Sequence, residues 1–284
     1  MNITLPDGSI RKLESGSTGL DLANSIGPGL AKAAIAVEVN GSQKDLCDPI
    51  MDDSEVSIIT IDSKEGLEIM RHTLTAQVLA RAVKNLYPDT KLAIGPTITD
   101  GFYYDFEFKK PISTEDLEEI EKEMKKVIAT NSSIIKSLHS REDAIKVFKS
   151  EKEPYKESII EDSDQEDNFQ LYYQEDSKFV DLCRGPHLPN LKHIGSFKLT
   201  KLAGAYWKGD SKNKMLTRIY GTAWKNDKDL NAYLHSIEEA EKRDHRKLGK
   251  EMDLFHFQEE APGMVFWHPN GWTIYRNLRN FVRR

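Results

Sequence analysis

The chain has 284 residues, 38% of them hydrophobic, which is enough for two or three domains with cores of their own. Its formal net charge of -6 at pH 7 excludes a histone-like or polybasic nucleic-acid binder, although one face can still be basic. Its two cysteines, Cys47 and Cys183, lie far apart, which excludes a disulfide framework and fits a reducing compartment. The sequence contains neither a signal-peptide pattern nor a run of about 18 apolar residues, so we expect a cytoplasmic protein with no membrane partner.

Residues 1–62 are predicted to form a small sheet with one helix. The stretch "NITLPDGSI" predicts two short strands joined by a Pro-Asp-Gly turn, and "GLDLANSI" has apolar residues at helical spacing. A third strand, "AIAVEV", is followed by an Asn40-Gly41 turn typical of hairpins, and "EVSIITI" predicts a last strand. Because no ionisable residues cluster here at site-like spacing, we expect an accessory module.

The remaining chain mixes helices and strands. Apolar residues three and four apart predict helices over 65–86 and 114–129 and another that begins at residue 140. The stretches "KLAIGPTITDGFYYDFEF", "FQLYYQE" and "FKLTKLAGAYWKGDSKNKMLTRIYGTAW" predict strands separated by glycine and proline turns. A long charged helix is predicted over 227–250. The fold class is therefore α+β, with several domains.

The stretch "VDLCRGPHLP" (180–189) carries the clearest chemical signal. Cys183 and His187 lie four residues apart in a Gly-Pro loop that suits neither a helix nor a central strand. The thiolate of Cys183 and the imidazole of His187, together with His72 on an early helix, can hold a metal ion or a polarised water. Asp181 can orient an imidazole. On spacing alone, a buried apolar cysteine and a hydrogen-bonded loop histidine remain the alternative.

Several motifs together extend this interpretation. The stretches "LAIGPTITDGFYYDF", "FVDLCRGPHLPN", "GAYWKGDSKNKMLTRIYGTAW" and "RDHRKLGKEMDLFHFQEEAPGMVFWHPNGWTIYR" resemble, in order and spacing, the N-terminal half of bacterial threonyl-tRNA synthetases, and the resemblance covers the whole chain. It implies a ubiquitin-like TGS domain at 1–62 and an editing domain of the alanyl/threonyl-tRNA synthetase type at 63–225. It further implies a linker helix at 226–243 and the start of a class II catalytic domain at 244–284.

The resemblance also implies roles for individual residues. The catalytic residues of the editing cleft would be His72, Lys156, Asp181, Cys183 and His187. The residues that bind the substrate would be Tyr104, Tyr206, Trp207 and Lys208, the last three in a basic hairpin that could equally be only solvated. If the cleft holds a metal ion, zinc bound by His72, Cys183 and His187 is the candidate.

The implied function is proofreading of threonyl-tRNA. A threonine pocket cannot strongly reject serine, because one missing methyl group costs only about 1–3 kcal/mol, so a second site must hydrolyse the seryl ester. The expected partner is the acceptor arm of tRNA(Thr). The alternatives are a free-standing trans-editing deacylase and a non-catalytic tRNA-binding or regulatory module.

The family's ligase chemistry is not expected of this chain by itself. The second and third class II motifs, with the ATP and zinc sites of the catalytic domain, are absent from the sequence, so we expect no threonyl-adenylate. Most of the family's homodimer interface would be missing for the same reason. We expect the chain to retain hydrolysis of mischarged tRNA at most.

The first helix departs from the family pattern of two histidines four residues apart. In "RHTLTAQVLARAV" the fourth residue after His72 is Ala76, and the alternative alignment pairs Thr73 with Gln77. Residues five apart in an α-helix are rotated by about 140°, so His72 and Gln77 face different ways unless a π-bulge absorbs the extra residue. Because glutamine cannot act as a base, we expect weak or absent editing; the competing view is that the other site residues suffice.

Overall fold

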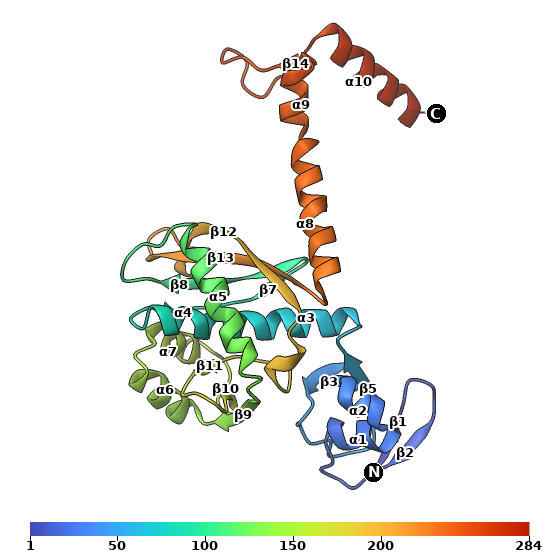
Figure 1. Cartoon of the computed structure of the whole chain (residues 1–284), viewed down its shortest axis with the longest axis vertical. Helices are drawn as coiled ribbons and strands as arrows, with labels where there is room; N and C mark the ends of the chain where they lie inside the picture. The colour runs from blue at the N-terminus through green and yellow to red at the C-terminus, as the bar shows by residue number, and fades with distance from the viewer. Residues whose placement is uncertain (284) are drawn as a thin grey trace. The chain divides into compact units, whose positions relative to one another are not determined.

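The computed structural model describes residues 1–283. They form two compact units, one over residues 1–230 and one from residue 231 onward, and each is described by itself (Figure 1). In the described residues, no helix is long and apolar enough to cross a membrane.

Five strands at the N-terminus form one sheet in the order β2-β1-β5-β3-β4. They are β1 (Asn2–Thr4), β2 (Ile10–Lys12), β3 (Ala34–Val39), β4 (Ser42–Asp45) and β5 (Ser54–Thr60). The helix α1 (Gly19–Ile26) packs on this sheet and is followed by α2 (Pro28–Ala33), which the sequence pattern did not predict. The β3–β4 hairpin turns at Asn40 and Gly41, both with positive φ, as the Asn-Gly pair predicts.

One long helical rod follows, and it confirms the helix predicted over 65–86. It consists of α3 (Lys64–Thr73), the π-helical segment η1 (Leu74–Leu79) and α4 (Ala80–Leu86). Ser63 begins it, because its side chain accepts a hydrogen bond from the Gly66 N–H at 2.9 Å. The π-segment takes up one residue more than an α-helix of the same rise.

Two sheets lie on either side of this rod (Figure 1). The larger has the order β12-β13-β8-β6, with β7 paired to β8, and the smaller has the order β11-β10-β9. The strands of the larger sheet are β6 (Lys91–Leu92), β7 (Thr97–Ile98), β8 (Gly101–Glu107), β12 (Ser196–Tyr206) and β13 (Met215–Trp224). Those of the smaller sheet are β9 (Ile134–His139), β10 (Phe169–Gln174) and β11 (Val180–Leu182).

Three α-helices and two 3-10 segments complete the first unit. They are α5 (Asp116–Ala129), α6 (Arg141–Ser150), α7 (Pro154–Glu161), η2 (Leu191–His193) and η3 (Trp207–Gly209). The rod, α5 and the larger sheet share one core, which extends into the N-terminal sheet through Ile35, Ala36 and Ile59. The N-terminal sheet is therefore packed against the elements that share this core.

The last elements are α8 (Asp227–Lys242), α9 (His245–Glu251), β14 (Phe255–His256), β15 (Phe266–Trp267) and α10 (Pro269–Val282). The single helix predicted over 227–250 is wrong, because α8 ends at Lys242. Asp244 leaves the helical conformation, and its carboxylate accepts from the Arg246 N–H at 2.8 Å, which caps a new helix. The predicted domain boundaries at 62, 225 and 243 fall between or at the ends of elements and stay predictions.

Candidate functional site

The π-helical segment decides which side chains of the rod reach the site. Ala76 lines the same cavity as His72. Gln77, by contrast, meets β10: its carbonyl oxygen accepts from Gln174 Nε2 at 2.6 Å, and its own Oε1 lies 3.3 Å from the same nitrogen. The π-turn is present, but it does not pair His72 with Gln77.

The Cys-x3-His loop follows β11. Its Gly185 has φ of 64°, a conformation that favours glycine, and the Gly185-Pro186 peptide is cis. A Cβ at Gly185 would lie 2.1 Å from Tyr172 Oη, so the loop backbone passes directly over that side chain. The sequence at this turn therefore fixes the path that brings Cys183 and His187 back to the rod.

The structure brings His72, Cys183 and His187 together. Their ligand atoms all lie within 4.8 Å of one another, and His72 Nε2 is 2.7 Å from Cys183 Sγ. The rings of His72 and His187 are stacked, with centroids 4.7 Å apart and an interplanar angle of 3°. Burial lowers the pKa of His72, so its imidazole is neutral at neutral pH.

Thr73 sets the tautomer of His187. Its hydroxyl donates to the Ile69 carbonyl oxygen at 2.9 Å, and it accepts from the Leu188 N–H at 2.9 Å. His187 Nδ1 lies 3.1 Å from the same oxygen. Since a hydroxyl has a single proton, which Ile69 receives, Nδ1 must be the donor in this contact. His187 therefore carries its proton on Nδ1, and its buried Nε2 keeps a lone pair that has no partner among residues 1–283.

Lys156, Asp181 and Tyr104 form a second buried group. Lys156 Nζ, on α7, lies 2.5 Å from Asp181 Oδ1, and the Tyr104 hydroxyl of β8 donates to Oδ2 at 3.3 Å. The Leu182 N–H donates to Asp181 at 2.8 Å. Burial raises the pKa of Asp181, while the Lys156 ammonium opposes that shift, and burial holds the pKa of Tyr104 well above its ordinary value. Asp181, which was predicted to orient an imidazole, holds Lys156 and Tyr104, and its predicted role toward an imidazole stays a prediction.

His72 and Cys183 of the first group and all three residues of the second line one cavity of about 620 Å³, within the range of small-molecule sites. His187 is buried behind them and does not line the cavity. The lining residues with polar or ionisable side chains include His72, Tyr104, Lys156, Asp162, Gln170, Asp181, Cys183, Arg184 and Lys208. Gly95 lies at its wall, where a Cβ would sit 2.1 Å from Tyr104 Cδ2. Cations, imidazole, thiol and carboxylate thus converge on a single chamber.

Comparison with known proteins identifies two domain families in this chain. The TGS domain family matches residues 1–60, and the threonyl and alanyl tRNA synthetase second additional domain matches residues 170–220. The chain carries both of these synthetase domains. It is 54% identical over 281 residues to a threonine–tRNA ligase of Prochlorococcus marinus (strain MIT 9211) and 53% identical over 282 residues to that of Hahella chejuensis (strain KCTC 2396). These matches span 99% of this chain and 44% of each relative.

The three hairpin residues predicted to bind substrate differ in their relation to the chamber. Lys208 lines the cavity and pairs with Asp162 at 2.5 Å. Trp207 packs against Tyr155, with ring centroids 4.8 Å apart, and Tyr206 is 45% exposed. Their roles stay predictions.

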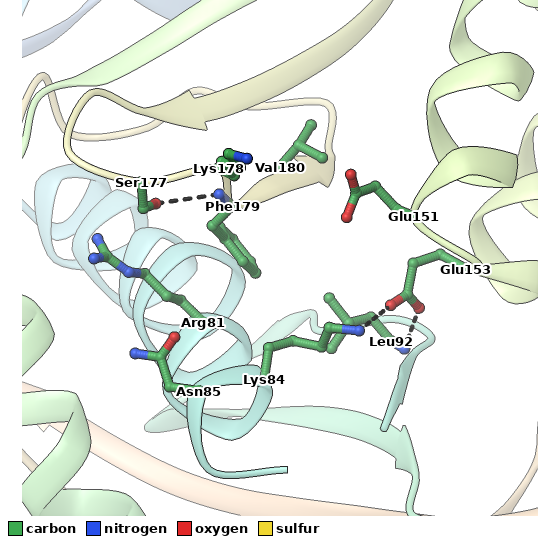
Figure 2. A pocket seen from close by; sticks show the side chains of 10 residues that line it. All are labelled: Arg81, Lys84, Asn85, Leu92, Glu151, Glu153, Ser177, Lys178, Phe179 and Val180. Atoms are coloured by element: carbon green, nitrogen blue, oxygen red, sulfur yellow. Dashed lines mark hydrogen bonds and ion pairs between the residues drawn. The ribbon is translucent and has the colours of Figure 1, made fainter. Parts of the chain in front are cut away.

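A buried ion pair fixes the helix that carries Lys156. Glu153, directly before α7, accepts from Lys84 Nζ at 2.7 Å and from the Leu92 N–H at 2.7 Å. Figure 2 shows this pair at the edge of a second cavity of about 250 Å³, where Lys84 of the rod points toward Glu153. This contact joins α7 to α4 and β6. It therefore helps to hold Lys156, on α7, at the first cavity.

Sequence reasoning missed Asp45 and Tyr172, and it considered Thr73 only as an alignment position. Asp45, in the TGS domain, accepts from the His187 N–H at 2.8 Å and from the Tyr172 hydroxyl at 2.7 Å. No local pattern marks these residues, because each acts on a partner more than 100 positions away.

The three residues predicted as metal ligands fit zinc. Two imidazoles and a thiol are zinc's preferred donors, and His187 Nε2 is a buried nitrogen with a free lone pair and no partner in the described chain. The structure therefore supports a possible His-Cys-His metal-binding group.

Proposed function

We propose that this chain is the tRNA-binding and proofreading part of a threonyl-tRNA synthetase, and that its chamber hydrolyses seryl-tRNA(Thr). The observation that carries the proposal is the group of His72, Cys183 and His187 at a chamber that also contains Lys156 and Asp181. The similarity to two threonine–tRNA ligases supports tRNA(Thr) as the substrate in this proposal. Threonylation, which needs ATP, belongs to the whole synthetase in this proposal.

Hydrolysis requires a base, a water and a stabilised oxyanion. His72 accepts a proton from the water, whose oxygen attacks the carbonyl carbon of the seryl ester. Lys156 keeps donors besides the one that meets Asp181, and these stabilise the developing oxyanion. The intermediate then breaks the bond to the terminal ribose oxygen, which takes the proton back, so the products are serine and free tRNA.

Zinc is the metal that this donor set suits, and His72, Cys183 and His187 would hold it. A bound zinc ion would lower the pKa of a water molecule, and it would then replace His72, as one of its ligands, in activating that water. The Nδ1–H tautomer that Thr73 imposes on His187 directs Nε2 to this task. Metal content measured on protein purified without chelators tests this part of the proposal.

We expect the hydrolysis to be slow. The family resemblance places a second imidazole on the first helix, and here a methyl group, that of Ala76, lines the chamber next to His72. Gln77 is buried against Gln174 and cannot accept a proton. General base catalysis contributes about 10²–10⁴-fold, so a weakened base leaves a slow enzyme.

The acceptor end of the tRNA would enter past the exposed cations at the chamber. Arg184 and Lys208 both line it and are exposed, which suits contacts to phosphate. The exposed ring of Tyr206 is available for stacking on an unpaired base.

The deciding experiment compares deacylation of seryl-tRNA(Thr) and threonyl-tRNA(Thr) by the purified chain. We expect slow turnover of the seryl ester, sparing of the threonyl ester, and loss of turnover in His72→Ala. Binding of tRNA without any turnover would favour a non-catalytic tRNA-binding module, and a fast rate that falls sharply in His187→Ala would overturn the expectation of a weakened site.

A further inference from the structure

One carboxylate of the TGS domain, that of Asp45, contacts the loop that carries Cys183 and His187. Asp45 ends β4 and is only 6% exposed. Its Oδ1 accepts from the His187 N–H at 2.8 Å, and its Oδ2 accepts from the Tyr172 hydroxyl at 2.7 Å and lies 3.1 Å from Lys136 Nζ. His187 and Tyr172 lie within residues 170–220, which the second additional domain matches, and Lys136 lies on β9, which pairs with β10. The Asp45 side chain therefore joins the TGS domain to the small sheet and the loop of the site.

These contacts fix both the backbone and the ring of His187. The hydrogen bond from its N–H holds the backbone, while Tyr172, held by Asp45, lies edge-on to the His187 ring with centroids 4.4 Å apart at 80°. Gly185 allows the close approach, because a Cβ there would also lie 3.2 Å from Asp45 Oδ2. Backbone and ring of His187 therefore both depend on the position of Asp45.

Asp45 is itself held rigidly. Its N–H donates to Asp48 Oδ2 at 3.1 Å, and Asp48 accepts from Lys136 Nζ at 2.8 Å. Beside it, β3 pairs with β4 at Ala36 and Asp45, and Ala36 belongs to the core shared with the helical rod. A buried carboxylate with three hydrogen-bond partners is costly to move, because any partner it loses is left unpaired.

We propose that Asp45 is a positioning residue for the hydrolytic site. The TGS domain then takes part in editing as well as in tRNA binding. The inference rests on the proposed hydrolytic function. Asp45 does not contact the chamber; it acts by holding the loop that presents His187 and Cys183 to His72.

Amide hydrogen exchange isolates the contact. Pro186 and Pro189 have no amide hydrogen, so the segment 186–189 exchanges only at His187 and Leu188. The His187 amide bonds to Asp45 and the Leu188 amide to Thr73, so the second serves as an internal reference. In the full chain with Asp45→Ala, we expect exchange at His187 to become about tenfold faster or more, with a smaller change at Leu188.

Kinetics test the consequence for catalysis. We expect Asp45→Ala to lower kcat for seryl-tRNA(Thr) by about tenfold or more with little change in KM, since a loosened loop misplaces the reacting groups and not the tRNA. Asp45→Asn should restore most of the rate, because its amide oxygen still accepts from His187. In that variant the Tyr172 hydroxyl can donate to Gln170 Oε1, which lies 3.0 Å away.

A matched control separates positioning from general loss of TGS stability. Asp21 accepts from the N–H and hydroxyl of Thr18 at 2.8 Å each and completes the capping box of α1, whose N-cap is Thr18, in the same domain. Asp21→Ala should lower the midpoint of thermal unfolding of the full chain and leave kcat unchanged.

Each outcome decides the inference. Unchanged exchange at His187 in Asp45→Ala, or faster exchange with unchanged kcat, overturns it, as does an equal loss of kcat in Asp21→Ala. If the wild-type chain does not hydrolyse seryl-tRNA at all, the proposed function fails. In that case exchange at His187 alone decides whether Asp45 holds the loop.

Discussion

The hydroxyl of Thr73 offers the sharpest test of the site geometry. In Thr73→Val the side chain keeps its shape but loses the oxygen that accepts from His187 Nδ1–H and from the Leu188 N–H. Both donors are buried. Leaving a buried donor unpaired costs about 1–3 kcal/mol, so the two together predict a loss of about 2–6 kcal/mol in the free energy of unfolding.

Thr73→Ser is the matched control. It keeps the oxygen and removes one buried methyl group, which predicts a loss of only about 1 kcal/mol. Urea unfolding of the two variants and the wild type measures the difference, and ¹⁵N NMR of the imidazole reports which nitrogen of His187 carries the proton. We expect the Nδ1–H tautomer in the wild type and Ser variants and its loss in the Val variant. Equal stability of Val and Ser variants, within about 0.5 kcal/mol, would refute the assignment of Thr73 as the acceptor.

Three further results are expected. Ala76→His should raise deacylation of seryl-tRNA(Thr) whereas Gln77→His should not, because only position 76 lines the chamber beside His72; equal rates in steady-state assays would contradict this. The hydrogen bonds from Arg81 lower the pKa of Asp176 from 3.8 to about 2, so this pair stabilises the fold above pH 3.8 and the stability is lost as the pH falls toward 2. Unfolding measured against pH should show this loss in the wild type and not in Arg81→Ala, and an identical acid profile would rule the pair out. In its own cells the protein should have an intact mass well above 32.4 kDa if it works as part of a whole synthetase, and a species of 32.4 kDa would argue for a separate short protein.

Local chemistry explains what the sequence could predict. The Asn40-Gly41 turn and the Gly185-Pro186 loop are encoded by residues that restrict or permit particular backbone angles, so both were found from a few letters. The helix over 114–129 follows from its apolar spacing and begins, in the structure, at Asp116.

Long-range contacts explain what it could not. The partners of Asp45 lie 91, 127 and 142 positions away, and no spacing rule reaches so far. The same holds for Thr73 and His187, 114 positions apart. The error at 227–250 has a local cause, since the apolar pattern continues past Lys242 while the Asp244 cap starts a new helix.

The π-turn connects the departure in sequence to its effect on the chamber. The π-helical segment spans Leu74–Leu79, residues of α3 and α4 on either side of it pack in one core, and His72 meets Cys183. The same turn places Ala76 at the chamber and directs Gln77 toward Gln174. Ala76, four residues after His72, therefore holds the place from which a second imidazole would face the chamber. A single Gln77→His substitution leaves the base missing because that side chain lies against Gln174, whereas Ala76→His supplies an imidazole at the chamber.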